Sequence, residues 1–254
     1  MSKSLIYTLS IAGFDPSGGA GLLADIKTFE HFKCLGMAVQ TANTIQTENH
    51  FLSVNWVDEN LMLQQIETLL KIYNFNYIKI GLIKNIESLN KTVELCLSYH
   101  PKTKIIWDTI LKTSTGFDFK IKNNGLTDIL KKIYLITPNW TEIKQLANTD
   151  DSIEGAKILA QYTKVYLKGG HNQNNVGKDY LFEIQNQLLK QKNYNPKPTV
   201  KPITPKHGSG CVFSSALTAN LSKGYNLHKS VLKSKRYTEN YLSSNKTLLG
   251  THKL

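Results

Sequence analysis

Apolar residues along the 254-residue chain recur at two spacings, one typical of buried strands and the other typical of helices. Residues 5–12 form a buried-strand pattern that ends at Gly13, and residues 22–32 carry apolar side chains at helical spacing. The same alternation predicts further strands at residues 37–46, 77–82, 104–107, 134–136 and 164–167. It predicts further helices at residues 58–72, 85–99, 126–131, 141–147, 152–161, 207–221 and about 227–242.

Strands that alternate with helices indicate parallel strand–helix–strand units. We therefore expect one α/β domain over residues 1–254, with a mostly parallel central sheet and helices on both faces. Residues 179–184 and 188–192 depart from the alternation and predict a β-hairpin. Ligands of such sheets bind beyond the carboxyl ends of the strands. The residues at or just after these ends, which would meet in one crevice, are 13–21, Gln46, Leu82, Asp108, Asn139 and Lys168.

Composition and charge limit the classes of partner. Hydrophobic residues make up 41% of the chain and charged residues 20%, which is ordinary for a globular protein. The net charge of +12 favours anionic partners, but the lysines are dispersed and do not interleave with aromatics, so we expect no nucleic-acid partner. No apolar run reaches membrane-spanning length, so we expect no membrane partner. The wide spacing of Cys34, Cys96 and Cys211 argues against disulfides and zinc, and favours a reducing, cytoplasmic location.

Two glycines lead into the helix expected after residue 207, in the run His207-Gly208-Ser209-Gly210-Cys211. Such glycines let successive N–H groups point the same way, and the helix start adds unpaired N–H groups and a positive dipole end. We expect Gly208, Ser209 and Gly210 to form an anion hole for a transferred phosphoryl group. The dipole would also lower the pKa of Cys211, so that a thiolate could accept the proton of an attacking alcohol. The alternative is a glycine-capped helix start with a buried cysteine.

A second glycine-rich turn covers residues 15–21, directly after the first expected strand, and Asp25 follows in the next helix. A turn of this kind allows a ligand to approach the backbone closely. No Gly-Lys-Ser/Thr sequence follows, so the turn is not a Walker A loop, and the glycine spacing excludes a full dinucleotide fingerprint. A tight turn without a ligand is the alternative, and Asp25 fits a surface helix acid equally well.

Four further polar residues near strand ends are candidates for a nucleotide and metal site. Asn139 and Glu142 share one face of an expected helix start, where they could hold Mg²⁺ through water. They also match a capping box, and the two roles are compatible. Lys168 precedes two glycines and could reach nucleotide phosphates, although a plain glycine turn is the alternative. Asp108 is a candidate partner for metal or phosphate, or else a helix cap.

Gln46 ends an otherwise apolar and small-residue strand. Its amide offers one donor group and one acceptor, which match the edge of an aminopyrimidine. An exposed glutamine at a strand end is the alternative.

Five segments occur in a characteristic order along the chain. They are residues 9–29, Lys79-Ile80-Gly81-Leu82, Thr137-Pro138-Asn139, Lys168-Gly169-Gly170-His171 and His207-Gly208-Ser209-Gly210-Cys211. Together they resemble the motifs of the hydroxymethylpyrimidine/phosphomethylpyrimidine kinases, a branch of the ribokinase-like superfamily. The resemblance covers nearly the whole chain.

The resemblance implies a three-layer α/β/α sandwich, usually a homodimer, that uses ATP and Mg²⁺ in thiamine biosynthesis. It implies two phosphorylations, of 4-amino-5-hydroxymethyl-2-methylpyrimidine and then of its monophosphate. Cys211 stands where sugar kinases of the superfamily carry a catalytic aspartate. The implied contacts are, for the substrate, Gln46, Gly13, Asp25, Leu82 and Ile110; for the nucleotide, Lys168, Asn139 and Thr204; and for the metal, Glu142 and Asp108.

The chain departs from the family pattern at three positions. Leu82 stands where Met is more frequent, Ser209 replaces the usual Thr, and Thr47 replaces an Asn. A pyridoxal or pyridoxine kinase is the alternative within the superfamily, because such kinases share the Gly-Ser/Thr-Gly-Cys feature. Outside the kinases, the alternatives are a nucleotide-binding oxidoreductase, which the glycine spacing disfavours, and a nucleic-acid binder, which only the net charge favours.

Overall fold

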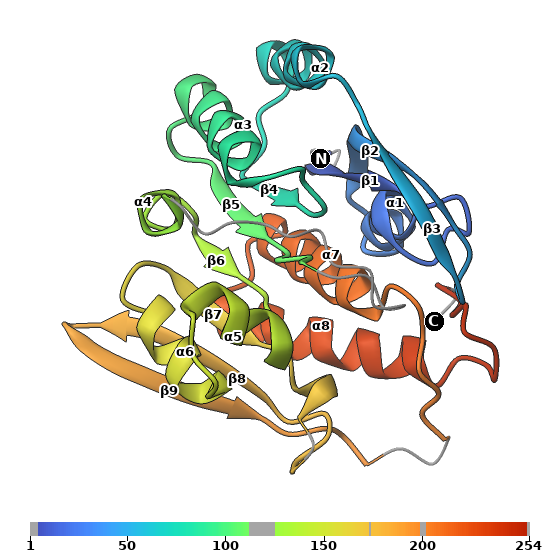
Figure 1. Cartoon of the computed structure of the whole chain (residues 1–254), viewed down its shortest axis with the longest axis vertical. Helices are drawn as coiled ribbons and strands as arrows, with labels where there is room; N and C mark the ends of the chain where they lie inside the picture. The colour runs from blue at the N-terminus through green and yellow to red at the C-terminus, as the bar shows by residue number, and fades with distance from the viewer. Residues whose placement is uncertain (1–4, 112–124, 173, 199–201, 253–254) are drawn as a thin grey trace.

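The computed structural model describes residues 5–111, 125–172, 174–198 and 202–252. Within them, nine strands form one sheet in the order β3-β2-β1-β4-β5-β6-β7-β8-β9 (Figure 1). The strands from β2 to β7 in this order pair in parallel, and β3, β8 and β9 are antiparallel additions at the two edges. The strands are β1 (Tyr7–Phe14), β2 (Leu35–Gln46), β3 (Phe51–Trp56), β4 (Tyr77–Ile80), β5 (Lys104–Trp107), β6 (Leu135–Ile136), β7 (Lys164–Leu167), β8 (Asp179–Gln185) and β9 (Leu188–Tyr194).

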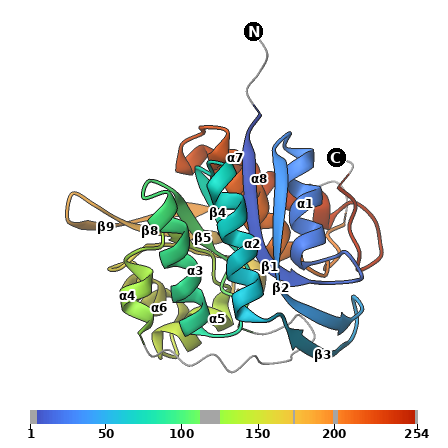
Figure 2. The ribbon, with the colours of Figure 1, turned by 90° about the horizontal axis from the view of Figure 1, so that it is seen from above.

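Helices cover both faces of the sheet, as Figures 1 and 2 show. One face carries α1 (Gly21–His31), α7 (Ser209–Ser222) and α8 (Leu227–Leu242). The other carries α2 (Glu59–Ile72), α3 (Ile86–Tyr99), α4 (Leu126–Leu130), α5 (Trp140–Ala147) and α6 (Ser152–Leu159). A short 3₁₀ helix, η1 (Gly169–His171), follows β7. The fold is therefore the three-layer α/β/α sandwich with a mostly parallel sheet that the sequence predicts.

The alternation of side chains along each strand builds two separate cores. In β5, Ile105 and Trp107 pack with the helices of the α2–α6 layer, whereas Ile106 faces α7 and α8. All three side chains are fully buried, as expected for a central parallel strand with helices on both faces.

Helix α7 is the most deeply buried helix of the described structure. Every residue from Cys211 to Ser222 is buried, and many of these side chains are small. A helix apolar or small on all sides can be enclosed by neighbours, and α7 packs between the sheet, α1 and α8. This burial gives the start of α7 a fixed place near the carboxyl ends of the strands.

The predicted elements are all present among the described residues, with boundaries that differ by a few positions. Asp58 caps α2 as predicted, by accepting a hydrogen bond from the Leu61 N–H. The predicted hairpin is confirmed, and Asn186 and Gln187 form its turn with positive φ angles. The sequence did not predict β3, which pairs with β2 at the edge of the sheet.

No described helix combines the length and the apolar character that crossing a membrane would require.

Candidate active site

The two glycine-rich turns interlock. Gly208 has a φ of +70°, and a Cβ on it would lie only 2.0 Å from the Gly19 carbonyl oxygen, so only glycine fits. Next to this contact, His207 Nε2 lies 2.9 Å from Asp15 Oδ2. Asp15 also accepts a hydrogen bond from the Ala20 N–H at 2.8 Å. Burial opposes ionisation of Asp15, but these hydrogen bonds outweigh it and lower the pKa of the carboxyl.

Gly208 is also the N-cap residue of α7, in the left-handed conformation. It has no side chain with which to cap the helix, and no other described side chain does so. The Ser209 N–H bonds to the Lys206 carbonyl at 3.4 Å, and the N–H groups of Gly210 and Cys211 lie in the same first turn of the helix. An anion hole at this glycine-lined helix start remains a prediction. We call residues 208–211 the cradle.

Lys168 lies directly beside the cradle. A Cβ on Gly210 would lie 3.2 Å from Lys168 Nζ, so the ammonium rests against the glycine backbone. Burial favours loss of the Lys168 proton, but the carboxylates of Asp108 and Glu142 outweigh it and raise the pKa to about 12. The ammonium is therefore charged at neutral pH, as a phosphate ligand requires. The sequence placed this lysine correctly at the end of a strand.

Asp108 connects three elements at this place. Its Oδ1 accepts hydrogen bonds from Lys168 Nζ at 2.8 Å and from Thr137 Oγ1 at 3.1 Å. Its Oδ2 accepts one from Ser214 Oγ of α7 at 3.0 Å. Although Asp108 is buried, which opposes ionisation, the positive charges of Lys168 and Lys79 lower its pKa.

Asn139 and Glu142 form the capping box of α5. Asn139 Oδ1 accepts from the Glu142 N–H at 2.9 Å, and Glu142 Oε2 accepts from the Asn139 N–H at 2.8 Å. A β-bridge between Asn139 and Lys168 holds both at the same edge of the sheet. Burial raises the pKa of Glu142 to about 7, and the nearby Asp108 carboxylate adds to the rise. The cap is thus confirmed, and a metal role remains a prediction.

The carboxylates of Asp108 and Glu142 provide the kind of oxygen ligands that Mg²⁺ prefers. The described residues include no cluster of three or more acidic, His or Cys side chains able to hold a metal ion. Mg²⁺ commonly takes one or two protein carboxylates and completes its shell with phosphate oxygens and water. Burial and the Asp108 charge raise the pKa of Glu142, and a divalent cation held by the two carboxylates would favour the ionised form of Glu142.

Cys211 departs from the chemistry expected of it. The thiol is buried and accepts a hydrogen bond from the Gly21 N–H at the start of α1. Burial nevertheless raises its pKa to about 12, against the lowering effect of Lys79. The prediction of a lowered pKa was wrong, because desolvation of a thiolate outweighs the positive ends of the helices. At neutral pH the thiol therefore keeps its proton.

Asp25 lies beneath the cradle and is fully buried. Its carboxylate accepts hydrogen bonds from Lys79 Nζ at 2.5 Å, Ser10 Oγ at 2.6 Å and Ser215 Oγ of α7 at 2.6 Å. It is not a surface acid. These hydrogen bonds attach α7 to the sheet. A direct contact between Asp25 and a substrate remains a prediction.

Helix α7 is thus attached to the sheet by two similar units, each with a lysine, an aspartate and a serine. Lys79 and Asp25 hold Ser215, while Lys168 and Asp108 hold the adjacent Ser214. Neither serine was among the predicted site residues, and Lys79 was identified only as part of the Lys79–Leu82 motif. Lys79 lies inside the short apolar strand β4, and a lysine at such a position indicates a buried ion pair.

The predicted substrate residues lie around the first strands. Gln46 is half-buried, and its Nε2 donates to Thr44 Oγ1 at 2.8 Å, which in turn donates to the Phe14 carbonyl at 2.8 Å. These two hydrogen bonds fix the Gln46 amide at the end of β2, next to the end of β1. A Cβ on Gly13 would lie 2.9 Å from Leu82 Cδ2, so Gly13 makes room for the Leu82 side chain.

Ile110 and Thr204 lie at the margins of this arrangement. Ile110 is half-buried two residues after Asp108, and its N–H bonds to the Asp108 carbonyl. Thr204 is half-buried, and its N–H donates to the Leu242 carbonyl at 3.1 Å, at the end of α8. The nucleotide role of Thr204 remains a prediction.

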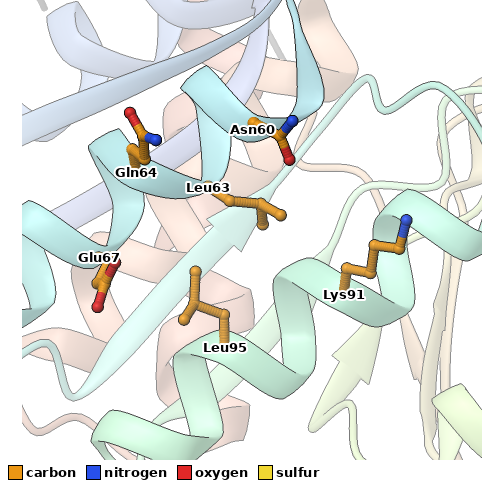
Figure 3. A pocket seen from close by; sticks show the side chains of 6 residues that line it. All are labelled: Asn60, Leu63, Gln64, Glu67, Lys91 and Leu95. Atoms are coloured by element: carbon orange, nitrogen blue, oxygen red, sulfur yellow. The ribbon is translucent and has the colours of Figure 1, made fainter.

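A surface groove lies between α2 and α3 (Figure 3). It is lined by Asn60, Leu63, Gln64, Glu67, Lys91 and Leu95. None of them is a predicted site residue, and two of them, Glu67 and Lys91, form ion pairs with Lys71 and with Glu59. The groove is a packing feature between two helices rather than part of the site.

A glycine turn, a helix start, a lysine and two carboxylates lie together at the carboxyl edge of a parallel sheet, as expected for a small-molecule kinase of the ribokinase-like fold. Residues 15–253 match the family model for phosphomethylpyrimidine kinase. The hydroxymethylpyrimidine/phosphomethylpyrimidine kinase of Aquifex aeolicus is 32% identical over 96% of both chains. The one from Staphylococcus aureus strain MSSA476 is 31% identical over 90% of this chain and 85% of its own. The chain belongs to the phosphomethylpyrimidine kinase family.

Solved structures agree with this family and fold. The phosphomethylpyrimidine kinase of Clostridium difficile 630 has a TM-score of 0.73 and 28% identity, over 92% of this chain and 97% of that chain. The pyridoxal kinase of Staphylococcus aureus in complex with ADP has a TM-score of 0.79 and 25% identity, over 97% of this chain and 91% of that chain. The predicted family and the ribokinase-like fold are thus confirmed.

Proposed function

We propose that this chain transfers the γ-phosphoryl group of ATP to the hydroxymethyl group of 4-amino-5-hydroxymethyl-2-methylpyrimidine, and then to the resulting monophosphate. The observation that carries the proposal is the contact of Lys168 with the glycine backbone of the cradle, beside Asp108 and Glu142. Positive charge and helix N–H groups thus face the same point. Phosphoryl transfer depends on such positioning and charge stabilisation more than on covalent chemistry.

In the first reaction, the hydroxymethyl oxygen attacks the γ-phosphorus, the bond to the β-phosphate oxygen breaks, and ADP leaves. The N–H groups of Gly208–Cys211 bind the oxygens of the transferring group, and Lys168 neutralises the β- and γ-phosphates. Asp108 and Glu142 would hold Mg²⁺, which shields the phosphate charges when bound. In the second reaction, a phosphate oxygen of the monophosphate takes the place of the alcohol.

Cys211 orients the acceptor hydroxyl in this scheme. Its thiol is protonated at neutral pH because its pKa is raised to about 12, so it is not a thiolate base in the free protein. The transition state of phosphoryl transfer is loose, so the alcohol needs little deprotonation before the transfer. Its proton leaves as the new P–O bond forms, to an oxygen of the transferred phosphoryl group and then to water. A hydrogen bond between the thiol and the alcohol oxygen would suffice to align the attack.

The substrate would lie between the cradle and the first strands. Gln46 would pair with the edge of the aminopyrimidine, since its amide is already fixed through Thr44. Gly13, Leu82 and Ile110 would form the apolar surroundings of the ring, and Asn139 and Thr204 would contact the nucleotide.

A pyridoxal kinase is the second candidate function. It is favoured by the Gly208–Cys211 sequence and by the fold similarity to the Staphylococcus aureus pyridoxal kinase in complex with pyridoxal, with a TM-score of 0.79. Leu82 and Thr47, which depart from the pyrimidine kinase pattern, would lie in or next to the proposed substrate site.

A coupled assay with Mg²⁺ and ATP separates the two candidates. We expect hydroxymethylpyrimidine and its monophosphate to be phosphorylated with higher kcat/KM than pyridoxal. A clear preference for pyridoxal would transfer the assignment to the second candidate, and no turnover of any of the three would refute both.

We further infer from the family resemblance that the chain works as a homodimer in the cytoplasm. Sedimentation of the purified chain tests the assembly, and a monomer at all concentrations would contradict it.

A further inference from the structure

Residues 243–252, which we call the C-terminal segment, return from the end of α8 to the two interlocked turns. Figure 1 shows this segment in red beside the orange stretch that leads into α7. The His207 N–H donates to the Leu248 carbonyl at 2.9 Å. A Cβ on Gly19 would lie 2.7 Å from Leu249 Cδ2 and 2.8 Å from the His207 ring. The segment therefore packs on both turns at the point where they meet.

Lys206 is the residue that fastens the C-terminal segment. Its side chain is buried, and the ammonium donates hydrogen bonds to Asn245 O at 2.7 Å, to Asn245 Oδ1 at 2.9 Å and to the Thr247 carbonyl. All three acceptors are uncharged oxygens, so the charge is satisfied by hydrogen bonds within this one segment. Burying an ammonium is unfavourable unless such partners are in place. Loss of Lys206 would therefore release residues 245–247.

The rest of the segment is built around the same residues. Asn245 Nδ2 and Thr247 Oγ1 both donate to the Leu249 carbonyl at 2.9 Å, which shapes the turn that carries the Leu249 side chain. Beyond it, Gly250 packs so closely on the Tyr241 ring that a Cβ there would lie 2.5 Å from ring atoms. The segment is thus an ordered turn that surrounds the ammonium of Lys206.

We propose that Lys206 is a positioning residue for phosphoryl transfer, which ties the C-terminal segment over the Asp15–Gly21 turn and the cradle so that the cradle N–H groups keep their orientation. This inference rests on the proposed function. Lys206 stands two residues before Gly208, whose left-handed backbone is packed against Gly19 and marks the start of the cradle. The bonds of Lys206, of the His207 N–H and of the His207 ring fix the peptide planes that lead into the cradle.

Lys206→Met tests the proposal, with Lys223→Met as the matched control. Lys223 also donates to a backbone carbonyl, that of Phe32 at 3.1 Å, but it lies at the opposite end of α7. We expect Lys206→Met to lower kcat by at least about tenfold, with the KM for ATP within about twofold, because the cradle is misplaced and the nucleotide side is not. Lys223→Met should leave kcat within about twofold even where both variants lose similar thermal stability. Lys206→Arg, which keeps the charge and the donors, should recover part of kcat.

Hydrogen exchange gives a readout that does not depend on the substrate. In Lys206→Met the amides of residues 207–211 should exchange faster, and those at the end of α7 should not. Should Lys206→Met fail to fold, Leu249→Ala removes the contact on Gly19 without touching the buried charge, and the same local exchange and loss of kcat are expected. Unchanged kcat and unchanged exchange at residues 207–211 in the folded variant would overturn the proposal. If the wild-type chain phosphorylates neither pyrimidine, the proposed function fails, and the exchange measurement still decides whether Lys206 orders the cradle.

Discussion

Glu142 is a buried carboxyl that holds its proton more tightly in the folded chain than in the unfolded chain. Burial and the Asp108 carboxylate raise its pKa from 4.5 to about 7. A carboxyl with a raised pKa stabilises the fold below its unfolded pKa, and that stability is lost as pH rises through the folded pKa. The ionised Glu142 therefore costs stability at neutral and higher pH, although the proposed metal role requires that ionised form.

Glu142→Gln should therefore increase the free energy of unfolding at high pH. Gln keeps an oxygen that can accept from the Asn139 N–H and from Thr109 Oγ1, so the capping box survives. In chelator-treated protein we expect a gain on the order of 2 to 3 kcal/mol at about pH 8, and almost none at about pH 4.5. Urea unfolding at both pH values measures it. An equal change in the free energy of unfolding at both pH values, or a loss at pH 8, would contradict this account of Glu142. The variant should also lose Mg²⁺-dependent turnover.

The chemistry of single residues was only partly predictable from the sequence. Strand-end positions placed Asp108 and Lys168 correctly beside the cradle, because the carboxyl ends of parallel strands share one edge. The pKa of Cys211 could not be predicted, because the sequence shows the helix start and not how far the thiol is buried. The roles of Ser214 and Ser215 also depend on which face of α7 meets the sheet, which only the packed structure reveals.

At the scale of elements, α7 determines the geometry of the site. Its first turn forms the cradle, its second turn carries the two serines that bind Asp25 and Asp108, and its apolar face packs on the sheet. Glycines with positive φ stand at both of its ends, Gly208 with +70° and Gly224 with +82°. The two ends differ in one respect. A Cβ at Gly224 meets nothing within 4 Å, whereas at Gly208 it meets backbone of the other glycine turn.

This difference makes Gly224→Ala a matched control for Gly208→Ala. Gly224→Ala should cost about 1 kcal/mol of unfolding free energy, the usual penalty for a left-handed non-glycine residue, with unchanged kcat. Gly208→Ala carries the same penalty and also pushes Gly19 away, so it should cost more and lower kcat by at least about tenfold. Denaturant unfolding and steady-state kinetics measure both. Equal losses of stability with normal kcat in both variants would show that the contact between Gly208 and Gly19 contributes neither to stability nor to turnover.

Most elements could be predicted because their apolar patterns are long or end at clear signals, such as Asp58 before α2. Strand β3 was missed, although residues 52–56 alternate apolar and polar side chains. The run is short and lies at the edge of the sheet, where Leu52 is exposed, so the alternation does not separate a buried face from an exposed one. Its partner along β2 stabilises it, and that pairing is not visible in the local sequence.

At the scale of the whole molecule, the site is assembled from segments far apart in the chain. The turn after β1, the ends of β5 and β7, the start of α5 and the start of α7 all meet at one edge of the sheet. The alternation of strands and helices predicts this edge, and the family motifs identify which residues face it. The C-terminal segment that closes over it carries no motif, so its place became visible only in the structure.

The most direct test of the central claim is the kinetics of Cys211→Ala together with its affinity for ATP. Cys211→Ser and Cys96→Ala are the controls, since Ser keeps a hydroxyl at the site and Cys96 is buried within α3, far along the chain from the cradle.

If Cys211 orients the acceptor at the cradle, Cys211→Ala should lower kcat by more than about tenfold while the dissociation constant for ATP stays within about twofold. Cys211→Ser should retain more turnover than Cys211→Ala, and Cys96→Ala should keep the kcat of the wild-type chain. A Cys211→Ala variant with near-normal kcat would contradict the claim that phosphoryl transfer takes place at the start of α7.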